Sequence, residues 1–335
     1  MKIGLSYDLK DSVCLSQGHP DDAFEEYDSP ETVNALAAAI EAQGHSVVRL
    51  GGGGEFITSI AQHRVDLVFN IAEGLGNYRS REAQVPAILE MLDIPYSGSD
   101  PQCLAICLDK PLTKKILAAS DITTPSWHVI NHIGQLAETH WKAFPLPAFI
   151  KPAYEGSSKG ITCGSIARSA DQLVVIATEL LERYRQPVLV EQFIAGDEVT
   201  VGIVDNAPPK VLGIMRVLPR RNTPDFIYGL EVKRDWERLV DYECPARLEP
   251  RVLQKIEDAS LKIFEVLGCR DFARIDFKIS SRGEPYFLEI NPLPGLNPGS
   301  GDLPIMAGKM GWTYQELITT IVNAALERYP QCVRR

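Results

Sequence analysis

Residues 270–300 read RDFARIDFKISSRGEPYFLEINPLPGLNPGS, and this stretch decides the expected fold. Two runs rich in β-branched and aromatic residues, 272–279 and 285–290, flank the turn signal Ser281-Arg282-Gly283. Such an arrangement predicts an antiparallel β-hairpin. The prolines and glycines that follow, from residue 292, predict a rigid loop that presents backbone amides at the end of the hairpin.

The predicted hairpin has two distinct faces, because side chains alternate along a strand. A turn centred on Arg282-Gly283 pairs Asp276 with Glu289 and Arg274 with Asn291 on one face. Two directly opposed carboxylates are destabilising unless a cation lies between them. A divalent ion held by carboxylates, an amide oxygen and nucleotide phosphates fits, which is how Mg²⁺ is usually bound. The alternative is that Arg274 alone neutralises the pair as a surface salt bridge. The other face is expected to be apolar core, formed by Ile275, Phe277, Ile279, Tyr286, Leu288 and Ile290.

The composition is that of a soluble globular protein, with 335 residues, 45% hydrophobic and 23% charged. A net charge of -10 argues against nucleic-acid and anionic-membrane partners, which need basic surfaces. No apolar run approaches the roughly 20 residues of a membrane span, and no signal-peptide pattern is visible. The seven cysteines lack CxxC spacing and predict reduced thiols in the cytoplasm, with Cys103 and Cys107 in buried core.

The first hundred residues alternate between strands and helices. Residues 2–7, 47–50 and 66–73 read as strands, and Ser29-Pro30 marks a helix start. This alternation predicts a parallel sheet covered by helices. Ligands of such sheets gather beyond the carboxyl ends of the strands, so Asn70, Glu73 and the loop 74–81 are expected to face the active cleft.

The middle of the chain offers a candidate phosphate loop. A helix is expected from Cys103 to Ser120, followed by a strand at 148–152 that leads into AYEGSSKG, residues 153–160. Small residues let backbone amides approach phosphate oxygens, while Lys151 and Lys159 could neutralise charge. An ordinary surface hairpin is the alternative.

Two further segments have open interpretations. Glu191 lies in the buried strand 187–194, where a carboxylate is costly without a partner. An adenine amino group, a ribose hydroxyl or a lysine would each be a suitable partner for this carboxylate. Residues 219–240 mix charges, prolines and aromatics, which suits a loop that orders over a ligand. The alternative is a loop that is simply exposed to solvent.

Taken together, four motifs resemble the ATP-grasp ligases, and most closely the D-alanine–D-alanine ligase family. They are KPAYEGSSKG, VEQFIAGDEVTVGI, FIYGLEVKRDW, and RIDF with LEINPLPG, and their order and spacing make the signal specific. The resemblance implies an α/β chain, α+β in its C-terminal part, with the ATP-grasp fold. Three domains are expected: an N-terminal parallel-sheet pre-ATP-grasp domain (1–105), a central lid domain (106–187) and a C-terminal catalytic domain (188–335).

The resemblance also implies an activity, that of an ATP-dependent carboxylate-amine ligase joining amino acids. ATP phosphorylates one carboxylate, and an amine attacks the acyl phosphate to give an amide, ADP and phosphate. The expected cofactors are ATP and two Mg²⁺ ions, with Mn²⁺ as an alternative. The expected partners are small amino-acid or peptide-like substrates, not nucleic acid or membrane. A homodimer is compatible with the family, although the sequence does not fix one.

Each implied site residue occupies a position in these motifs or in the segments around them. The implied catalytic residues are Arg274, Ser157 and Gly295. The implied nucleotide-binding residues are Lys110, Lys151, Ser158, Glu191, Phe193, Ile194, Glu198, Lys233 and Leu288. The implied metal ligands are Asp276, Glu289 and Asn291. The implied substrate residues are Glu25, Glu26, Tyr228, Arg234, Ser300 and Asp302.

Three departures from the family pattern concern specificity for D-alanine. The family's glycine-glycine-x-serine-x-glutamate signature is absent, and Glu25 or Glu26 either substitutes for its acid or belongs to a solvated acidic loop. Arg234 replaces a tyrosine, and residues 300–303 form a segment one residue longer than the family's serine-leucine site. The hypothesis is therefore an ATP-dependent amino-acid or peptide ligase of this family whose acceptor is not necessarily D-alanine. Two alternatives stay open: a tailoring ligase that acts on a non-peptide metabolite carboxylate, and a catalytically silent nucleotide-binding protein.

Overall fold

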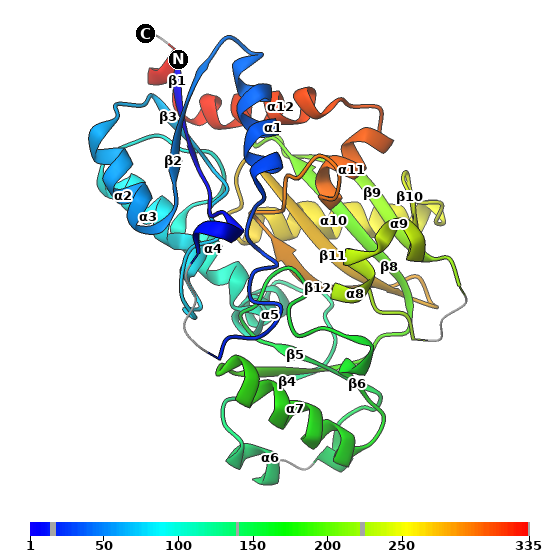
Figure 1. Cartoon of the computed structure of the whole chain (residues 1–335). Helices are drawn as coiled ribbons and strands as arrows, with labels where there is room; N and C mark the ends of the chain where they lie inside the picture. Colours follow the sequence, from blue (N-terminus) through cyan, green and yellow to red (C-terminus); the bar gives the residue numbers. More distant parts are fainter. Residues whose placement is uncertain (14–17, 139–140, 222–224, 334–335) are drawn as a thin grey trace.

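A five-stranded antiparallel sheet built around the predicted hairpin organises the C-terminal half of the chain (Figure 1). The structure is a computed structural model that describes residues 1–13, 18–138, 141–221 and 225–333. The strand order is β10-β9-β8-β11-β12. The bounds are β8 Gly196–Val204, β9 Lys210–Pro219, β10 Val240–Glu243, β11 Phe272–Ser280 and β12 Pro285–Asn291.

Helices cover both faces of this sheet. Residues of α10 (Pro250–Val266) pack with the odd-numbered side chains of β8, such as Val201, in one apolar cluster. The helix α11 (Asp302–Lys309) lies against the opposite face. Gly202 permits this approach, because a Cβ atom there would lie 2.6 Å from Cδ1 of Leu303. The β11–β12 hairpin therefore lies within a sheet that is anchored on both sides.

The hairpin itself is confirmed, but its register shifts between Asp276 and Phe277. Asp276 pairs with Glu289 as predicted, whereas Phe277 pairs with Phe287. The predicted place of Tyr286 and Leu288 in the apolar face is therefore wrong. Phe287 is buried in the core in their stead, and Leu288 lines a cavity.

Contacts from outside the hairpin hold this β-bulge. The N–H of Phe287 donates to the carbonyl of Thr123 at 2.9 Å. The carbonyl of Phe287 accepts from Oγ1 of Thr124 at 3.0 Å and from Nζ of Lys114 at 3.3 Å. A bulge adds one residue to one strand and turns the following side chains to the other face. These partners lie more than 160 positions away in the chain, so local alternation did not predict the shift.

The N-terminal sheet is parallel, as predicted, with the strand order β2-β1-β3. Its strands are β1 Lys2–Ser6, β2 Ser46–Gly51 and β3 Leu67–Asn70. The helices α1 (Pro30–Glu41) and α12 (Tyr314–Arg328) share one apolar cluster with this sheet. The helices α2 (Gly53–Gln62) and α3 (Gln84–Met91) share the cluster on its other face. The helix α12, although it lies near the end of the chain, thus belongs to the core of the N-terminal sheet.

The central sheet has the order β4-β7-β5-β6 and packs against α7 (Ala170–Tyr184). Its strands are β4 Trp127–Ile130, β5 Ala148–Pro152, β6 Ile166–Ala167 and β7 Val188–Gln192. The expected domain boundary between residues 187 and 188 would leave β7 outside this sheet. β7 pairs with both β4 and β5, so the sheet ends at Gln192.

The helix expected from Cys103 to Ser120 is two helices, α4 (Pro101–Leu108) and α5 (Lys110–Ala119). Asp109 breaks it, because its side chain accepts from the N–H of Leu112 and caps α5. The segment 219–240 contains two short helices, and its residues 222–224 lie outside the described residues. The remaining helices are α6 Gly134–Glu138, α8 Leu230–Arg234, α9 Trp236–Leu239 and α13 Pro330–Val333, with 3-10 turns at Lys10–Ser12, Arg81–Ala83, Trp141–Ala143 and Cys163–Ser165.

None of the helices in the described ranges combines the length and the apolar character needed to cross a bilayer. Cys103 and Cys107 are buried in the core, as predicted, and both are free thiols.

Candidate active site

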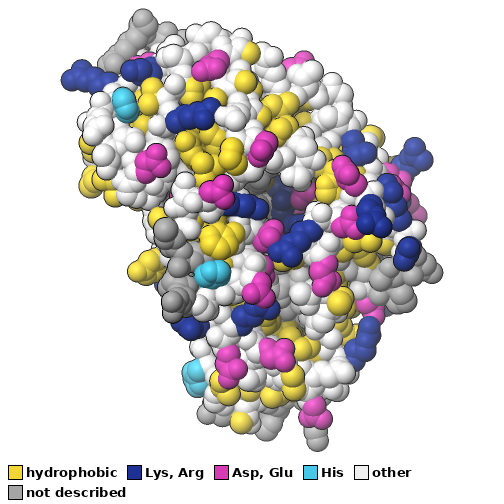
Figure 2. All heavy atoms as spheres, in the orientation of Figure 1, with side chains coloured by type: hydrophobic (Ala, Val, Ile, Leu, Met, Phe, Trp, Pro, Cys, Tyr) yellow, Lys and Arg dark blue, Asp and Glu magenta, His cyan; other side chains and the backbone are white. Residues whose placement is uncertain are grey.

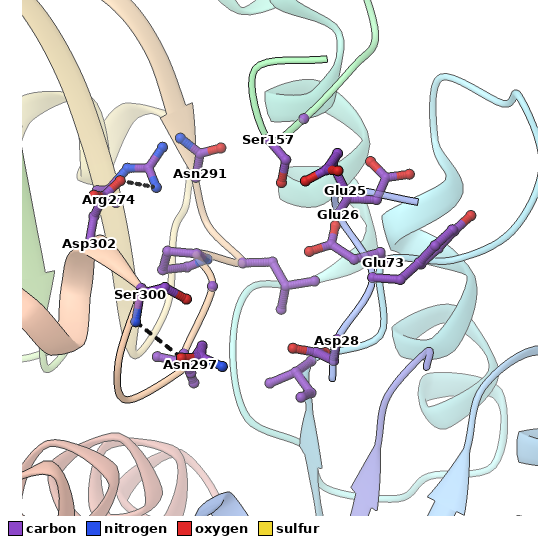
Figure 3. A pocket seen from close by; sticks show the side chains of 18 of the residues that line it. Glu25, Glu26, Asp28, Glu73, Ser157, Arg274, Asn291, Asn297, Ser300 and Asp302 are labelled. Carbon is purple, nitrogen blue, oxygen red and sulfur yellow. Dashed lines mark hydrogen bonds and ion pairs between the residues drawn. The ribbon is translucent and has the colours of Figure 1, made fainter. Parts of the chain in front are cut away.

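Two cavities adjoin at the end of the β11–β12 hairpin. The larger, about 470 Å³ in volume, lies between N-terminal residues and the loop 292–301 (Figure 3). The smaller lies between the central sheet and the hairpin. Asp276 and Glu289 line the smaller cavity, Asn291 lines the larger one, and Lys233 lines both. Figure 2 shows charged side chains of both signs around the hollow in this face.

The predicted metal face is assembled at this junction. Oδ1 of Asp276 accepts from Oγ1 of Thr200 at 2.6 Å, and Nδ2 of Asn291 lies 3.4 Å from Oδ2 of Asp276. Among the described residues, the ion pair of Glu289 is with Nζ of Lys110, at 3.6 Å. Two carboxylates and an amide supply the hard oxygen donors that Mg²⁺ prefers, so this set of residues fits a divalent ion.

Arg274 lies beside the metal face and is buried, which is at odds with the alternative of a surface salt bridge. Its Nη2 lies 2.8 Å from Oδ2 of Asp276, and its Nη1 lies 3.1 Å from Oδ2 of Asp302. Oδ1 of Asp302 also accepts from the hydroxyl of Tyr228 at 3.0 Å. Burial alone would lower the pKa of Arg274, but the two carboxylates raise it. The guanidinium therefore stays charged at every physiological pH.

Lysines on three different elements face Glu289. Burial by itself would raise the pKa of this carboxyl group, yet Lys110, Lys151 and Lys233 together with Arg274 lower it to about 2. Glu289 is therefore ionised and surrounded by positive charge. Such a cluster of cations and acids suits an anionic ligand that brings its own divalent ion.

Glu191 has lysine partners, one of the alternatives that the sequence left open. Its Oε2 lies 2.9 Å from Nζ of Lys151, and its Oε1 lies 2.5 Å from Nζ of Lys114. All three side chains are buried. Sequence reasoning missed Lys114, although it follows Lys110 by one helical turn on α5 and therefore shares its face.

The other residues predicted to bind nucleotide also come together. Phe193, Ile194 and Leu288 provide apolar walls of the smaller cavity, and Glu198 also lines it. Nζ of Lys278, a residue that sequence reasoning did not single out, lies 2.9 Å from Glu198. Of the nine residues predicted to bind nucleotide, the smaller cavity gathers Lys151, Ser158, Glu191, Phe193, Ile194, Glu198, Lys233 and Leu288, whereas Lys110 lines the larger one.

The loop after β5 contains two consecutive serines with left-handed backbone. The φ angles of Ser157 and Ser158 are 48° and 58°. This conformation costs roughly 1–2 kcal/mol for a residue with a Cβ atom, and such strain concentrates at functional sites. Ser157 lines the larger cavity and Ser158 the smaller one, so the turn lies where the two adjoin.

Glu26 is buried in an ionic network, so its assignment to a solvated acidic loop is wrong. Its carboxylate lies 2.8 Å from Nη2 of Arg81 and 2.9 Å from Nζ of Lys159. Glu155 also pairs with both cations. The ammonium of Lys159 is therefore held by two carboxylates, and its suggested phosphate role stays a prediction. No local pattern marks Arg81, whose partners lie 55 and 74 positions away.

The remaining predicted substrate residues surround the larger cavity. Glu25 and Arg234 line it and pair with each other at 2.6 Å. Gly295 and Ser300 line it from the loop after β12, whereas Tyr228 lines the smaller cavity. Asn70 accepts a hydrogen bond from Ser6 instead of facing the cavity.

The chain is similar in sequence to named ligases. Residues 116–323 match the family model described as D-ala D-ala ligase C-terminus. The D-alanine–D-alanine ligase of Aquifex aeolicus (strain VF5) is 33% identical over 295 residues, which cover 88% of this chain and 94% of that protein. The D-alanine–D-alanine ligase of Syntrophotalea carbinolica is 32% identical over 298 residues, which cover 89% of this chain and 91% of that protein.

Solved structures agree on the fold. The D-alanine–D-alanine ligase from Bacillus anthracis complexed with ATP superposes with a TM-score of 0.75 at 24% identity, covering 99% of each chain. VanG D-Ala:D-Ser ligase from Enterococcus faecalis superposes with a TM-score of 0.74 at 21% identity, and the match covers 97% of this chain and 99% of that one. With its sequence relatives, its matched family model and its ATP-grasp architecture, the chain belongs to the D-alanine–D-alanine ligase family.

Proposed function

We propose that this chain uses ATP to join the carboxylate of one amino acid to the amine of another, with release of ADP and phosphate. The observation that carries the proposal is the junction of the two cavities at Asp276 and Glu289, with Arg274 beside them. A nucleotide in the smaller cavity would direct its phosphates toward this junction. A carboxylate in the larger cavity would meet them there.

The residues of the junction suit phosphoryl transfer, which depends mainly on positioning and charge neutralisation. Asp276, Glu289 and Asn291 would hold Mg²⁺, which supplies neutralisation of phosphate charge when bound. Two carboxylates and an amide allow two ions to share the site. Lys110, Lys151 and Lys233 would contact phosphate oxygens, because all three lie close enough to lower the pKa of Glu289.

Arg274 is positioned to stabilise the anion that forms when the amine attacks the acyl phosphate. Preorganised donors are worth most where negative charge develops, and this guanidinium is already oriented by Asp276 and Asp302. The N–H of Gly295, which lines the same cavity, would be a second donor. Ser157 would close the site from the loop after β5.

Phosphate release and mass spectrometry test the proposal. Purified protein with ATP and Mg²⁺ is incubated with a panel of D- and L-amino acids, singly and in pairs. We expect phosphate only with the true pair, together with a product whose mass is the sum of both substrates minus water. Asp276→Asn protein is the control, because the amide has the size of the carboxylate but removes the charge of one predicted metal ligand. Phosphate release with no condensed product from any pair would contradict the proposal.

A further inference from the structure

The larger cavity has a wall of three carboxylates that the ionic network of Glu26 does not neutralise. We call Asp28, Glu73 and Glu82 the acidic wall. Among the residues that the structure describes, none of the three has a cation within ion-pair distance. Figure 3 shows Asp28 and Glu73 across the cavity from Arg274 and Asn291.

Of the three carboxylates of the acidic wall, Glu82 most clearly lacks a partner. It is 8% exposed and lines the cavity, and no described residue forms a hydrogen bond or ion pair with its side chain. A buried carboxylate without a partner is expensive, by several kcal/mol. Burial raises the pKa of Glu82 to about 7. A cation that arrives with a ligand would remove this cost.

The two buried cationic side chains near the acidic wall already pair with other groups. Arg81 pairs with Glu26 and Glu155. Lys110 pairs with Glu289 and donates to the carbonyl of Glu155. Lys10 also lines the cavity, but its side chain is exposed and forms no ion pair with Asp28. None of the three carboxyl groups of the acidic wall therefore has a cation of the protein as a direct partner, although Arg81 and Lys110 act on Glu82 and Lys10 acts on Asp28 without an ion pair.

We propose that the acyl donor is a diamino acid, whose two ammonium groups bind the acidic wall while its carboxylate lies at Arg274. The proposal rests on the function proposed above. One α-ammonium supplies a single positive charge to this group of three carboxyl side chains, whereas a second cationic group on the side chain of the donor supplies another. Arg274, on the opposite side of the cavity, provides positive charge for the carboxylate, and Lys110 and Lys233 also line the cavity. Lysine and ornithine have the required chemistry.

Lysine and norleucine form a matched pair of substrates that tests this, since they share a carbon chain and differ in the terminal ammonium. With ATP, Mg²⁺ and a common amine acceptor, we expect kcat/KM to be roughly tenfold or more higher for lysine, in one enantiomer. In Glu73→Gln and Asp28→Asn proteins, the ratio of lysine to norleucine should fall by roughly tenfold. Glu41→Gln, an exposed carboxylate on α1, should keep the wild-type ratio.

Calorimetry gives a second measurement that does not need turnover. Lysine should bind to the wild-type protein with a non-hydrolysable ATP analogue present, and norleucine should bind roughly tenfold or more weaker. Equal affinities, or equal rates for both substrates, would overturn the acidic-wall proposal while leaving the ligase assignment intact. Absence of phosphate release with every pair, together with preferential lysine binding, would overturn the ligase assignment alone.

Discussion

Nη1 of Arg274 lies 3.1 Å from Oδ2 of Asp302, the first residue of α11. The same guanidinium holds Asp276 through Nε and Nη2, at 3.1 and 2.8 Å. Arg274 thus connects the metal face on β11 to the helix that bounds the larger cavity. Its orientation is set before any ligand binds.

Arg274→Lys should reduce kcat by about 10²-fold, the size of effect seen when one donor to a developing anion is lost. Lysine keeps the charge but cannot present the fork that meets two carboxylates. The KM for ATP should change little, because Arg274 does not line the smaller cavity. Steady-state phosphate release measures both values. The matched control is Arg270→Lys, which changes an ion pair with Asp100 outside the cavities and should retain wild-type kcat. A parallel rise in the KM for ATP would contradict the assigned position.

Asp276→Asn should weaken the response to Mg²⁺. The lost carboxylate is a predicted ligand, and metal assistance to phosphoryl transfer is worth several kcal/mol, so kcat should fall on the order of 10²-fold or more. A magnesium titration of phosphate release should show a higher half-maximal concentration. Asp241→Asn removes the same charge from an exposed ion pair and should leave that concentration unchanged. An unaltered titration in the Asp276 variant would place the metal elsewhere.

Glu191→Gln should destabilise the fold, because it leaves the buried ammonium groups of Lys114 and Lys151 without their counter-charge. Removing one partner of a buried ion pair costs about 3–5 kcal/mol. Urea unfolding followed by circular dichroism measures the free energy of unfolding. Glu179→Gln, on the exposed side of α7, should change it by less than about 0.5 kcal/mol. If Glu191→Gln unfolds like the wild-type protein, water reaches these lysines and the site is not dry.

The stability of the ligand-free protein should fall as the pH rises from about 4 to 8. Burial and the nearby Asp8 raise the pKa of Asp28 to about 8, against the partial opposition of Lys10. The folded state keeps the proton through this window, while the unfolded chain releases it near its ordinary value of 3.8. The folded state therefore binds more protons, and unfolding becomes easier as the pH increases.

Asp28→Asn removes the part of this dependence that comes from Asp28. The variant should match the wild-type protein near pH 4 and exceed its free energy of unfolding by about 2 kcal/mol or more at pH 8. Thermal melts across the pH range provide the measurement. Asp258→Asn, on the exposed side of α10, should follow the wild-type curve. A lower melting temperature for Asp28→Asn at pH 8 would show that the ionised carboxylate is stabilised in the folded protein.

The parts of the site that lie close together in sequence were predicted from it. The pairing of Asp276 with Glu289 follows from a short turn and strand alternation. The shift that turns Leu288 toward the smaller cavity was not predicted, because Thr123, Thr124 and Lys114 cause it from outside the hairpin. Local alternation carries no information about such partners.

By itself, the sequence determined the alternation that builds the parallel sheet, the antiparallel hairpin and the motifs that identify the family. These features depend on period and turn chemistry within a few residues. Tertiary structure alone decided which charges meet: Arg81 with Glu26, Lys114 with Glu191, and Arg274 with Asp302. It also decided which carboxylates remain without a cation. Burial and long-range proximity set the cost of a charge, and both arise only when distant segments pack together.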